Sequence, residues 1–331
     1  MKAIIPVAGA GTRLRPFTYS QPKALIPIAG KPMLSYIIEE LQEAEVEEFI
    51  FIVGYLGDKI IDFVNTTYPH LKSHFVHQLQ REGLAQAVSL CKQYISPSDE
   101  IVIVLGDSII DVDFKEIIQL NKSILGVKKV DDPSKFGVAE VNANGTIKSL
   151  VEKPLIPKSN LALVGLYIIK ETAVLMECIN SLIENNRKTN SEFQLTDALM
   201  CMIQKGVELH SYKVENWFDV GQGDILLQTN AQLLKKFGRV DPKAQVENTI
   251  IVEPVSIAAN CKITDSIIGP NVTIGENAVI RNSIIRDTII GNYTTLVEMT
   301  LNNSVIGSDA SMKGLSQRLN IGDNTEIDFS K

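Results

Sequence analysis

The first 125 residues alternate between short apolar runs and segments whose apolar residues recur at helical spacing. In residues 33–44, the positions of Leu34, Ile37, Ile38 and Leu41 predict an amphipathic helix. Further helices are predicted around residues 59–64 and over 84–94, and strands over 3–7, 49–53, 73–77 and 101–105. Strand–helix alternation of this kind indicates a mainly parallel sheet with helices on both faces.

Beyond Gly126 the pattern changes to paired strands. Residues 137–141 and 146–151 flank Asn-Ala-Asn-Gly, a turn sequence typical of β-hairpins. Another strand is predicted over 163–169, followed by helices over 172–183 and 195–204. These elements predict a mixed extension of the first sheet. The expected fold class of this region is therefore α/β with a Rossmann-like mixed sheet.

Residues 239–331 have a third pattern, in which an apolar residue recurs every five or six positions. The series comprises Ile257, Ile263, Ile268, Ile274, Ile280, Ile285, Ile290, Leu296, Leu301 and Ile306. This period fits neither a helix nor a long strand, and it indicates a short parallel β-helix whose strands each point one apolar side chain into a common core. A β-sandwich with Gly and Asn turns is the alternative, although its strands would alternate over longer runs. We expect two domains, residues 1–238 and 239–331.

Composition supports a soluble two-domain chain and narrows its partners. The chain has 331 residues, of which 45% are hydrophobic and 21% are charged, with a formal net charge of −7. Because this balance leaves no broad basic surface, nucleic acid is not an expected partner. The N-terminal apolar run stops at Gly9, too short for a signal peptide, and no run approaches the ~20 residues of a membrane span. A membrane is therefore not an expected partner either.

The cysteines bear on the cellular compartment. Cys91, Cys178, Cys201 and Cys261 lie far apart in the sequence and form no CxxC pair. Neither a disulfide framework nor a zinc site is expected from this spacing. Four free thiols would fit a reducing compartment, so we expect a cytoplasmic protein.

The loop after the first strand, Gly9-Ala10-Gly11-Thr12-Arg13-Leu14, suggests phosphate binding. It is not a dinucleotide loop, because Leu14 stands where the third glycine should be, and no GK[ST] follows to make a P-loop. As a triphosphate loop, its glycine N–H groups would wrap phosphate oxygens, and Arg13 would offer a fork of donors to the same group. Lys23, between Pro22 and Ala24 and ahead of the helix that starts near Pro32, could lie beside the loop and reach a phosphorus under attack. The alternative is that Arg13 and Lys23 are ordinary surface residues.

Two aspartates are candidate metal ligands. Asp107 follows the strand predicted over 101–105, and the carboxyl ends of strands are where ligands bind in open α/β sheets. Asp219 lies between apolar residues in Trp-Phe-Asp-Val-Gly. A pair of carboxylates together with substrate phosphates is the usual way in which proteins hold Mg²⁺. Each aspartate alone could equally be a turn residue.

Taken together, these motifs resemble the sugar-1-phosphate nucleotidylyltransferases along the whole chain, and most of all the glucose-1-phosphate thymidylyltransferase branch with a C-terminal left-handed β-helix. The family pattern G-x-G-T-R-L-x-P…K-P…K-P-M is matched from Gly9 to Met33. Four later matches follow in order: Gln78 before GLAQA, GDS, FGVAEVNANGTIKSLVEKP and WFDVG.

The resemblance implies an enzyme in which a sugar phosphate oxygen attacks the α-phosphorus of a nucleoside triphosphate in line and pyrophosphate leaves. Residues 1–238 would form the nucleotidyltransferase domain. Arg13 and Lys23 would be catalytic, and Asp107 and Asp219 would hold Mg²⁺. The implied nucleotide-binding residues are Gly9, Gly11, Thr12, Gln78 and Gly83, with Gln78 pairing to thymine or uracil. The implied sugar-phosphate residues are Gly137, Glu152, Lys153 and Tyr167.

The resemblance suggests dTTP first and UTP second as the nucleotide, with glucose 1-phosphate as the sugar. Two departures concern the sugar: Val164 stands where thymidylyltransferases often have threonine, and Asn190 where the family often has an arginine. Arg187 or Lys188 could replace that arginine. The alternatives are a mannose-1-phosphate guanylyltransferase-type enzyme and a catalytically silent regulatory relative. A dinucleotide-dependent oxidoreductase is the least favoured reading.

The β-helix region raises the question of a second activity. Some members of the family it resembles carry a β-helix that acts as an acetyltransferase, typically with a histidine as general base. His70, His74, His77 and His210 all lie outside the repeats. We therefore expect the β-helix to serve assembly, because its flat exposed faces favour subunit packing into a homo-oligomer.

Overall fold

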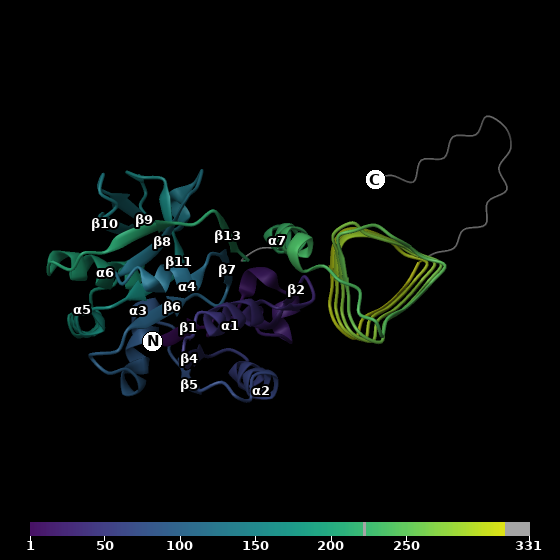
Figure 1. The fold of residues 1–331 in the computed structure, drawn as a ribbon, viewed down its shortest axis with the longest axis horizontal. Helices are drawn as coiled ribbons and strands as arrows, with labels where there is room; N and C mark the ends of the chain where they lie inside the picture. Colours follow the sequence, from purple (N-terminus) through teal and green to yellow (C-terminus); the bar gives the residue numbers. More distant parts are fainter. Residues whose placement is uncertain (221–222, 315–331) are drawn as a thin grey trace. The chain divides into compact units, whose positions relative to one another are not determined.

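The computed structural model describes residues 1–220 and 223–314, which fall into two compact units (Figure 1). Of the described residues, those up to Thr229 form the first unit and those from Asn230 to Gly314 the second. The division lies within α7 (Gly223–Phe237), the last helix before the repeats. Among the described residues, no helix is both long and apolar enough to cross a membrane.

The first unit is built on a nine-stranded mixed sheet. β1 (Lys2–Pro6) runs at its centre, parallel to β4 (Glu48–Val53) and β6 (Ile101–Val104), and β5 (Ser73–His77) extends the parallel part beyond β4. These strands are short apolar runs because helices cover both of their faces. The remaining strands are β8 (Ile124–Lys129), β9 (Gly137–Val141), β10 (Ile147–Glu152), β11 (Leu161–Ile169) and β12 (His210–Lys213). Since β11 pairs antiparallel with β6, the predicted Rossmann-like mixed sheet is confirmed.

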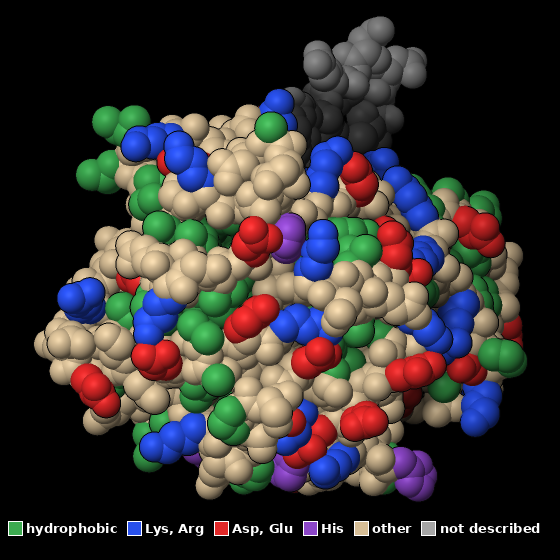
Figure 2. Space-filling view, turned by 60° about the vertical axis from the view of Figure 1, so that its left-hand side comes forward, with side chains coloured by type: hydrophobic (Ala, Val, Ile, Leu, Met, Phe, Trp, Pro, Cys, Tyr) green, Lys and Arg blue, Asp and Glu red, His purple; other side chains and the backbone are tan. Residues whose placement is uncertain are grey.

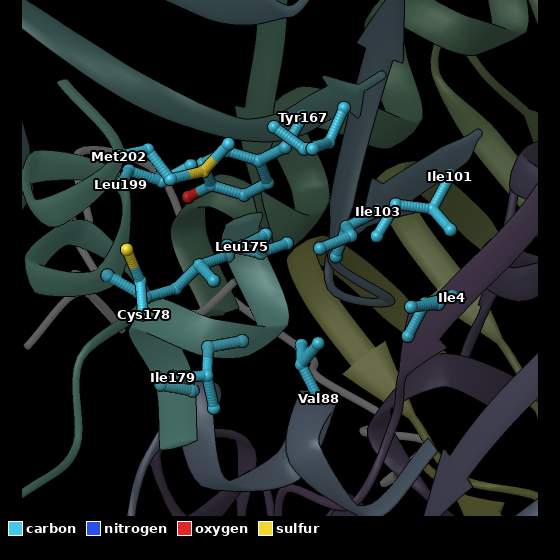
Figure 3. Close-up of a cluster of buried hydrophobic side chains, with 14 of the residues drawn as sticks. Ile4, Val88, Ile101, Ile103, Tyr167, Leu175, Cys178, Ile179, Leu199 and Met202 are labelled. Carbon is cyan, nitrogen blue, oxygen red and sulfur yellow. The ribbon is translucent and has the colours of Figure 1, made fainter. Parts of the chain in front are cut away.

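Alternating side chains of the strands enter two separate cores. Ile4 packs with α3 (Leu84–Ser89), α5 (Thr172–Glu184) and α6 (Leu195–Gln204), as Figure 3 shows for Leu175 and Leu199. The neighbouring side chains of Ala3 and Ile5 face the core formed with the helices of the other face, which are α1 (Met33–Glu43), α2 (Gly57–Thr67) and α4 (Phe114–Gln119). The helix predicted over 84–94 is shorter than expected, because α3 ends at Ser89 and a 3₁₀ turn, Leu90–Tyr94, completes it.

A two-stranded antiparallel ribbon follows β6 and was not predicted from the sequence. β7 (Ser108–Asp111) pairs with β13 (Asn216–Asp219) over four residue pairs. A small β2–β3 hairpin (Pro27–Ile28 and Lys31–Pro32) precedes α1. Of the candidate phosphate and metal residues, Asp219 lies in β13, and Asp107 directly precedes β7.

The expectation of four free thiols is wrong for two of the cysteines. Cys178 in α5 and Cys201 in α6 form a disulfide, with Cα atoms 5.9 Å apart. The two helices pack against each other, so residues 23 positions apart in the sequence become neighbours. Cys91 and Cys261 are free and buried. The argument for a reducing compartment from four free thiols therefore loses its basis.

The second unit is a parallel β-helix. Its strands are β14 (Gln245–Glu247), β15 (Ile250–Ile251), β16 (Val255–Ile257), β17 (Lys262–Thr264), β18 (Ile267–Ile268), β19 (Val272–Ile274), β20 (Val279–Arg281), β21 (Ile284–Ile290), β22 (Thr295–Val297), β23 (Thr300–Ile306) and β24 (Ser311–Lys313). They coil around a triangular core, seen end-on in Figure 1. Ile263 pairs in parallel with Ile280, one coil of 17 residues later, and Ile280 with Leu296. All three side chains are fully buried, which confirms the β-helix and excludes the sandwich.

The charge distribution agrees with the acidic composition. On the face that Figure 2 shows, basic and acidic side chains are intermixed rather than gathered into one basic area. A phosphate-binding function therefore depends on individual cations held in a defined site, not on a broad positive surface.

Candidate active site

The loop after β1 is folded back onto the chain that follows it. Gly11 has a left-handed backbone (φ 60°), and its carbonyl accepts a hydrogen bond of 2.8 Å from Thr18 Oγ1. A Cβ at Gly11 would stand 2.9 Å from Thr18 Cγ2 and 3.0 Å from Lys23 Cβ. Glycine is therefore needed here for backbone conformation and for space. Gly9, by contrast, faces open space, since no atom lies within 4 Å of its ideal Cβ position.

The close approach at Gly11 brings Lys23 to the end of β6. Lys23 Nζ lies 2.7 Å from Asp107 Oδ2, with side chains 11% and 43% exposed. The β7–β13 ribbon then places Asp219 opposite Ser108, next in sequence to Asp107, and Val220 N donates to Asp107 O at 3.1 Å. Two carboxylates and an ammonium group from three distant parts of the chain thus meet at one point.

The electrostatics of Asp219 show that the aspartates interact. Burial raises the pKa of Asp219 above its ordinary value of 3.8, and the negative charge of Asp107 raises it further, while Lys23 and Arg13 act in the opposite direction. A divalent cation would relieve this repulsion between the carboxylates. In the described part of the chain no cluster of three or more His, Cys, Asp or Glu side chains is placed to hold a metal. Two carboxylates, completed by substrate phosphates and water, are a donor set of the kind with which proteins usually hold Mg²⁺.

A cavity of about 200 Å³ joins the aspartates to a second group of predicted residues. Its lining residues include Arg13, Asp107 and Asp219, and also Gly137, Glu152 and Tyr167. Its further lining residues are Leu84, Leu105, Ser108, Lys135, Phe136, Leu163, Val164, Gly165, Gln194, Leu195, Thr196 and Trp217. Arg13 and the two candidate metal ligands therefore share one cavity with Gly137, Glu152 and Tyr167, whereas Gly9, Gly11 and Lys23 are not among its lining residues.

Several of the lining residues contact Glu152 or lie close to it. Thr196 Oγ1 donates to Glu152 Oε2 at 2.7 Å, and Lys153 Nζ lies 3.7 Å from Glu152 Oε1. Tyr167 is almost fully buried; burial raises its pKa, and the charge of Glu152 raises it further, so the hydroxyl keeps its proton. A carboxylate beside a protonated phenol offers both an acceptor and a donor to sugar hydroxyls.

Gln78 and Gly83 lie together, outside the lining of this cavity. Gln78 Nε2 donates to Gly83 O at 3.3 Å and to Gln86 Oε1 at 2.8 Å. Gly83 has φ 113°, and a Cβ there would stand 2.4 Å from Phe193 O. These contacts hold together the loop between β5 and α3, which contains both residues. Thr12, in the 3₁₀ turn Thr12–Leu14, and Lys153 also lie outside the cavity lining.

Comparison with known proteins identifies the family. A model of the "Nucleotidyl transferase" family matches residues 2–236, and a "GlmU-like, C-terminal hexapeptide" model matches residues 237–295. The chain belongs to the nucleotidyl transferase family. It is thus an enzyme of the nucleotidyltransferase class with a C-terminal left-handed hexapeptide β-helix, and both predictions are confirmed.

Three relatives illustrate the range of the family. The "Bifunctional protein GlmU" of Methanocaldococcus jannaschii is 37% identical over 76% of this chain, which spans only 59% of that protein. The "Glucose-1-phosphate thymidylyltransferase" of Streptomyces griseus is 28% identical over the full length of both chains. A solved structure titled as a UDP-glucose pyrophosphorylase complexed with UDP-glucose is 27% identical over 71% of this chain and 98% of its own, with a TM-score of 0.62.

The two residues that depart from the family pattern, Val164 and Asn190, lie in different surroundings. Val164 is buried in the cavity wall, so it presents a methyl group where the family often has a hydroxyl. Asn190 is exposed and, like Arg187 and Lys188, does not line the cavity. Lys188 is instead held by Glu82 at 3.0 Å and lies over the ring of Phe193. The structure therefore gives no support to the idea that Arg187 or Lys188 replaces the family arginine.

Sequence analysis missed several cavity residues. Trp217 packs edge-on against Phe136, with ring centroids 5.0 Å apart, and its Nε1 lies 3.5 Å from Ser108 Oγ. Trp217 belongs to the WFDVG motif and Thr196 to the helix predicted over 195–204, but neither residue was assigned to the site. Lys135 contributes a cation to the cavity and pairs with Asp132 at 3.0 Å; it belongs to no pattern that would have marked it.

Proposed function

We propose that the protein transfers a nucleotidyl group from a nucleoside triphosphate to a sugar 1-phosphate, giving a nucleoside diphosphate sugar and pyrophosphate. dTTP is the first candidate nucleotide and UTP the second, and glucose 1-phosphate is the first candidate sugar. The observation that carries the proposal is the shared cavity. Arg13, Asp107 and Asp219 line it together with Gly137, Glu152 and Tyr167.

The chemistry follows from this arrangement. A phosphate oxygen of the sugar 1-phosphate forms a bond to the α-phosphorus, and the bond from that phosphorus to the bridging oxygen of the β-phosphate breaks. Lys23 stabilises the charge on the α-phosphate, and Arg13 binds the leaving phosphates. No proton transfer is needed, so catalysis rests on positioning and charge stabilisation.

Asp107 and Asp219 would hold Mg²⁺, which when bound offsets the negative charge of the phosphates. Lys23 is paired with Asp107, one of the two carboxylates, and in this proposal it also contacts a substrate phosphate. Gly9, Gly11 and Thr12 approach the triphosphate through the backbone of the loop. These assignments agree with the acidic pair at the cavity and with the open space around Gly9.

Gln78 and Gly83 contact the base in this proposal. A side-chain amide pairs with the imide edge of thymine or uracil, and relatives of this chain are named for both bases. A guanylyltransferase acting on mannose 1-phosphate is the alternative within the class, and a silent regulatory relative is the alternative outside it. A catalytically silent protein is disfavoured, because Arg13, Lys23 and both aspartates are present and lie in one site.

One panel tests the proposal. Four sugar 1-phosphates are combined with five nucleoside triphosphates, and pyrophosphate release is measured with and without a chelator. We expect release with glucose 1-phosphate plus dTTP or UTP, and its loss on chelation. Release that persists with chelator would refute the metal assignment. Release only with GTP and mannose 1-phosphate would select the alternative, and no release from any pair would support a silent relative.

For the β-helix we propose assembly into a homo-oligomer through a second copy of this chain. Ile250, Ile267 and Ile284 occupy equivalent positions on successive coils and are 61%, 37% and 47% exposed. Such a stripe of outward apolar side chains favours burial against a partner. The acetyltransferase alternative finds no support, because the four histidines all precede residue 230.

Glu substitution in the middle of the stripe tests the assembly. Ile267→Glu places a charge on the apolar face, so we expect the mass measured by light scattering to fall towards that of a monomer. Lys262→Glu, an exposed change on another strand of the same coil, is the control and leaves the mass unchanged. An unchanged mass for Ile267→Glu would remove this face from the proposed interface.

A further inference from the structure

Thr196, in the first turn of α6, is a polar residue with a defined partner in the cavity. Its side chain is buried, and its hydroxyl donates to Glu152 Oε2 at 2.7 Å across 44 positions of sequence. A hydrogen bond to a charged group in a buried setting is among the stronger ones in proteins. The bond therefore constrains how the Glu152 carboxylate is oriented.

Gly137 shows how closely these groups are packed. It is the register partner of Glu152 where β9 pairs with β10. A Cβ on Gly137 would stand 3.1 Å from both Glu152 Oε2 and Thr196 Oγ1. The lack of a side chain at this position lets the hydroxyl and the carboxylate meet directly against the sheet.

The helix that carries Thr196 is itself fixed in place. Cys201, further along α6, is joined to Cys178 of α5, and Leu195 and Leu199 are buried in the core that these helices share with the sheet (Figure 3). The hydroxyl is therefore presented from a rigid element rather than from a mobile loop, which is what precise orientation of a binding group requires.

We propose that Thr196 is a positioning residue for the sugar 1-phosphate. Its hydroxyl donates a hydrogen bond to Glu152 Oε2 and so orients the carboxylate. The other oxygen, Oε1, then accepts hydrogen bonds from sugar hydroxyls. Without this bond the carboxylate samples several rotamers, and ordering it costs binding free energy. The inference rests on the proposed function, in which Glu152 contacts the sugar.

Two substitutions at one position test the inference. Thr196→Val keeps the shape but removes the donor, so we expect the KM for the sugar 1-phosphate to rise about tenfold. The KM for the nucleoside triphosphate stays within about twofold of wild type, because Thr196 acts at the sugar end only. Thr196→Ser keeps the donor and restores the sugar KM. The sugar 1-phosphate used is the one with which the wild-type enzyme releases pyrophosphate fastest.

Thr172→Val is the matched control. Thr172 is a buried threonine at the start of α5 whose hydroxyl bonds only weakly, at 3.5 Å to Ile169 O, and it does not line the cavity. We expect both KM values of this variant to match wild type. The inference is overturned if Thr196→Val leaves the sugar KM unchanged, raises both KM values equally, or is not corrected by serine. If wild-type protein releases no pyrophosphate from any pair, the proposed function fails first, and the inference fails with it.

Discussion

The β-helix and the candidate site of the first unit differ in how often the same residue contact is repeated. In the β-helix one contact recurs, since Ile263, Ile280 and Leu296 occupy the same buried position on successive coils. In the candidate site each contact occurs once: Gly11 makes room for Thr18 and Lys23 in the loop after β1, whereas Gly137 makes room for Glu152 and Thr196 in the cavity. Repetition spreads stability over many equivalent residues, whereas a site concentrates function in a few.

The largest expected effect is that of removing a single cation from the site. Lys23→Ala leaves the α-phosphate without its preorganised charge and should lower kcat by on the order of 10²-fold or more. Pyrophosphate release at saturating substrates measures it. Lys148→Ala, an exposed lysine on β10, is the control and keeps wild-type turnover. A Lys23→Ala enzyme with wild-type turnover would show that the site does not depend on this cation.

In the β-helix a single core substitution should change stability and leave chemistry intact. Ile280→Ala opens a cavity in the triangular core and should lower the free energy of unfolding by about 2–5 kcal/mol, whereas Ile280→Val should cost about 0.5–1.5 kcal/mol. Denaturant unfolding gives these values, and KM for both substrates should stay at wild type. A rise in either KM for Ile280→Ala would contradict the separation between the two regions.

The same difference explains what could be predicted from the sequence. The parallel strands, the helix over 195–204 and the β-helix follow from periodic patterns that each short segment carries by itself. The β7–β13 ribbon does not, because it pairs Ser108 with Asp219 across more than a hundred residues and neither strand is long or regular. The bond between Thr196 and Glu152 is likewise invisible until the sheet and α6 are packed.

The candidate residues were found because they lie in motifs, not because their contacts could be foreseen. Arg13, Asp107 and Asp219 converge on the cavity. Asp107 was expected there because it follows a parallel strand, whereas Asp219 comes from the antiparallel ribbon. The disulfide was missed for the opposite reason: a separation of 23 residues has no meaning until α5 and α6 are known to pack side by side.

The disulfide should contribute to the stability of the first unit. Reduction of the bond between Cys178 and Cys201 restores chain entropy to the unfolded state, so the free energy of unfolding should fall by about 2–4 kcal/mol. Thermal unfolding with and without a thiol reductant measures the change. The Cys178→Ala/Cys201→Ala variant is the control and should not respond to reductant. A wild-type protein equally insensitive to reductant would show that the bond adds no stability.

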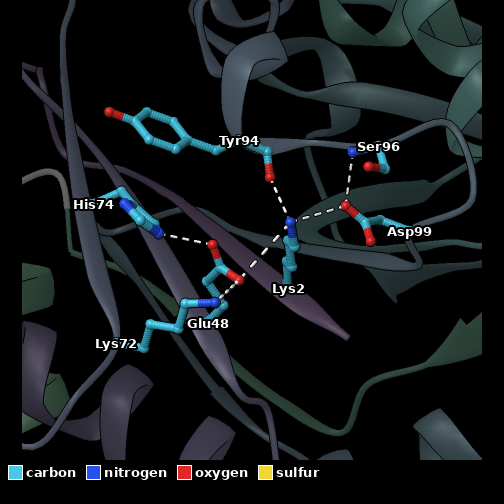
Figure 4. A network of polar contacts seen from close by, with 7 residues as sticks. All are labelled: Lys2, Glu48, Lys72, His74, Tyr94, Ser96 and Asp99. Atoms are coloured by element: carbon cyan, nitrogen blue, oxygen red, sulfur yellow. Dashed lines mark hydrogen bonds and ion pairs between the residues drawn. The ribbon is translucent and has the colours of Figure 1, made fainter.

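The smallest effect concerns the amino-terminal ends of the parallel strands, away from the site at their carboxyl ends. Glu48, at the start of β4, is bonded by Lys72 at 2.8 Å and by His74 at 2.7 Å, with Lys2 at 3.8 Å (Figure 4). Burial raises the pKa of Glu48, but the hydrogen bonds from Lys72 and His74 and the charges of Lys2 and Lys72 outweigh it. The net result is a pKa below the ordinary value of 4.5.

Because the folded pKa of Glu48 is lowered, its contribution to stability is present above pH 4.5 and is lost as the pH falls through the folded value. Glu48→Gln should therefore lower the free energy of unfolding by about 1–2 kcal/mol at pH 7 and by less as the pH falls below 4.5. Denaturant unfolding across this range measures it, and Glu45→Gln, at the exposed Lys115 pair, is the control. If the difference in free energy of unfolding between wild type and Glu48→Gln did not change with pH, the contribution of Glu48 would come from packing and not from its charge. We expect the KM values of Glu48→Gln to match wild type, because Glu48 is not among the residues that line the cavity.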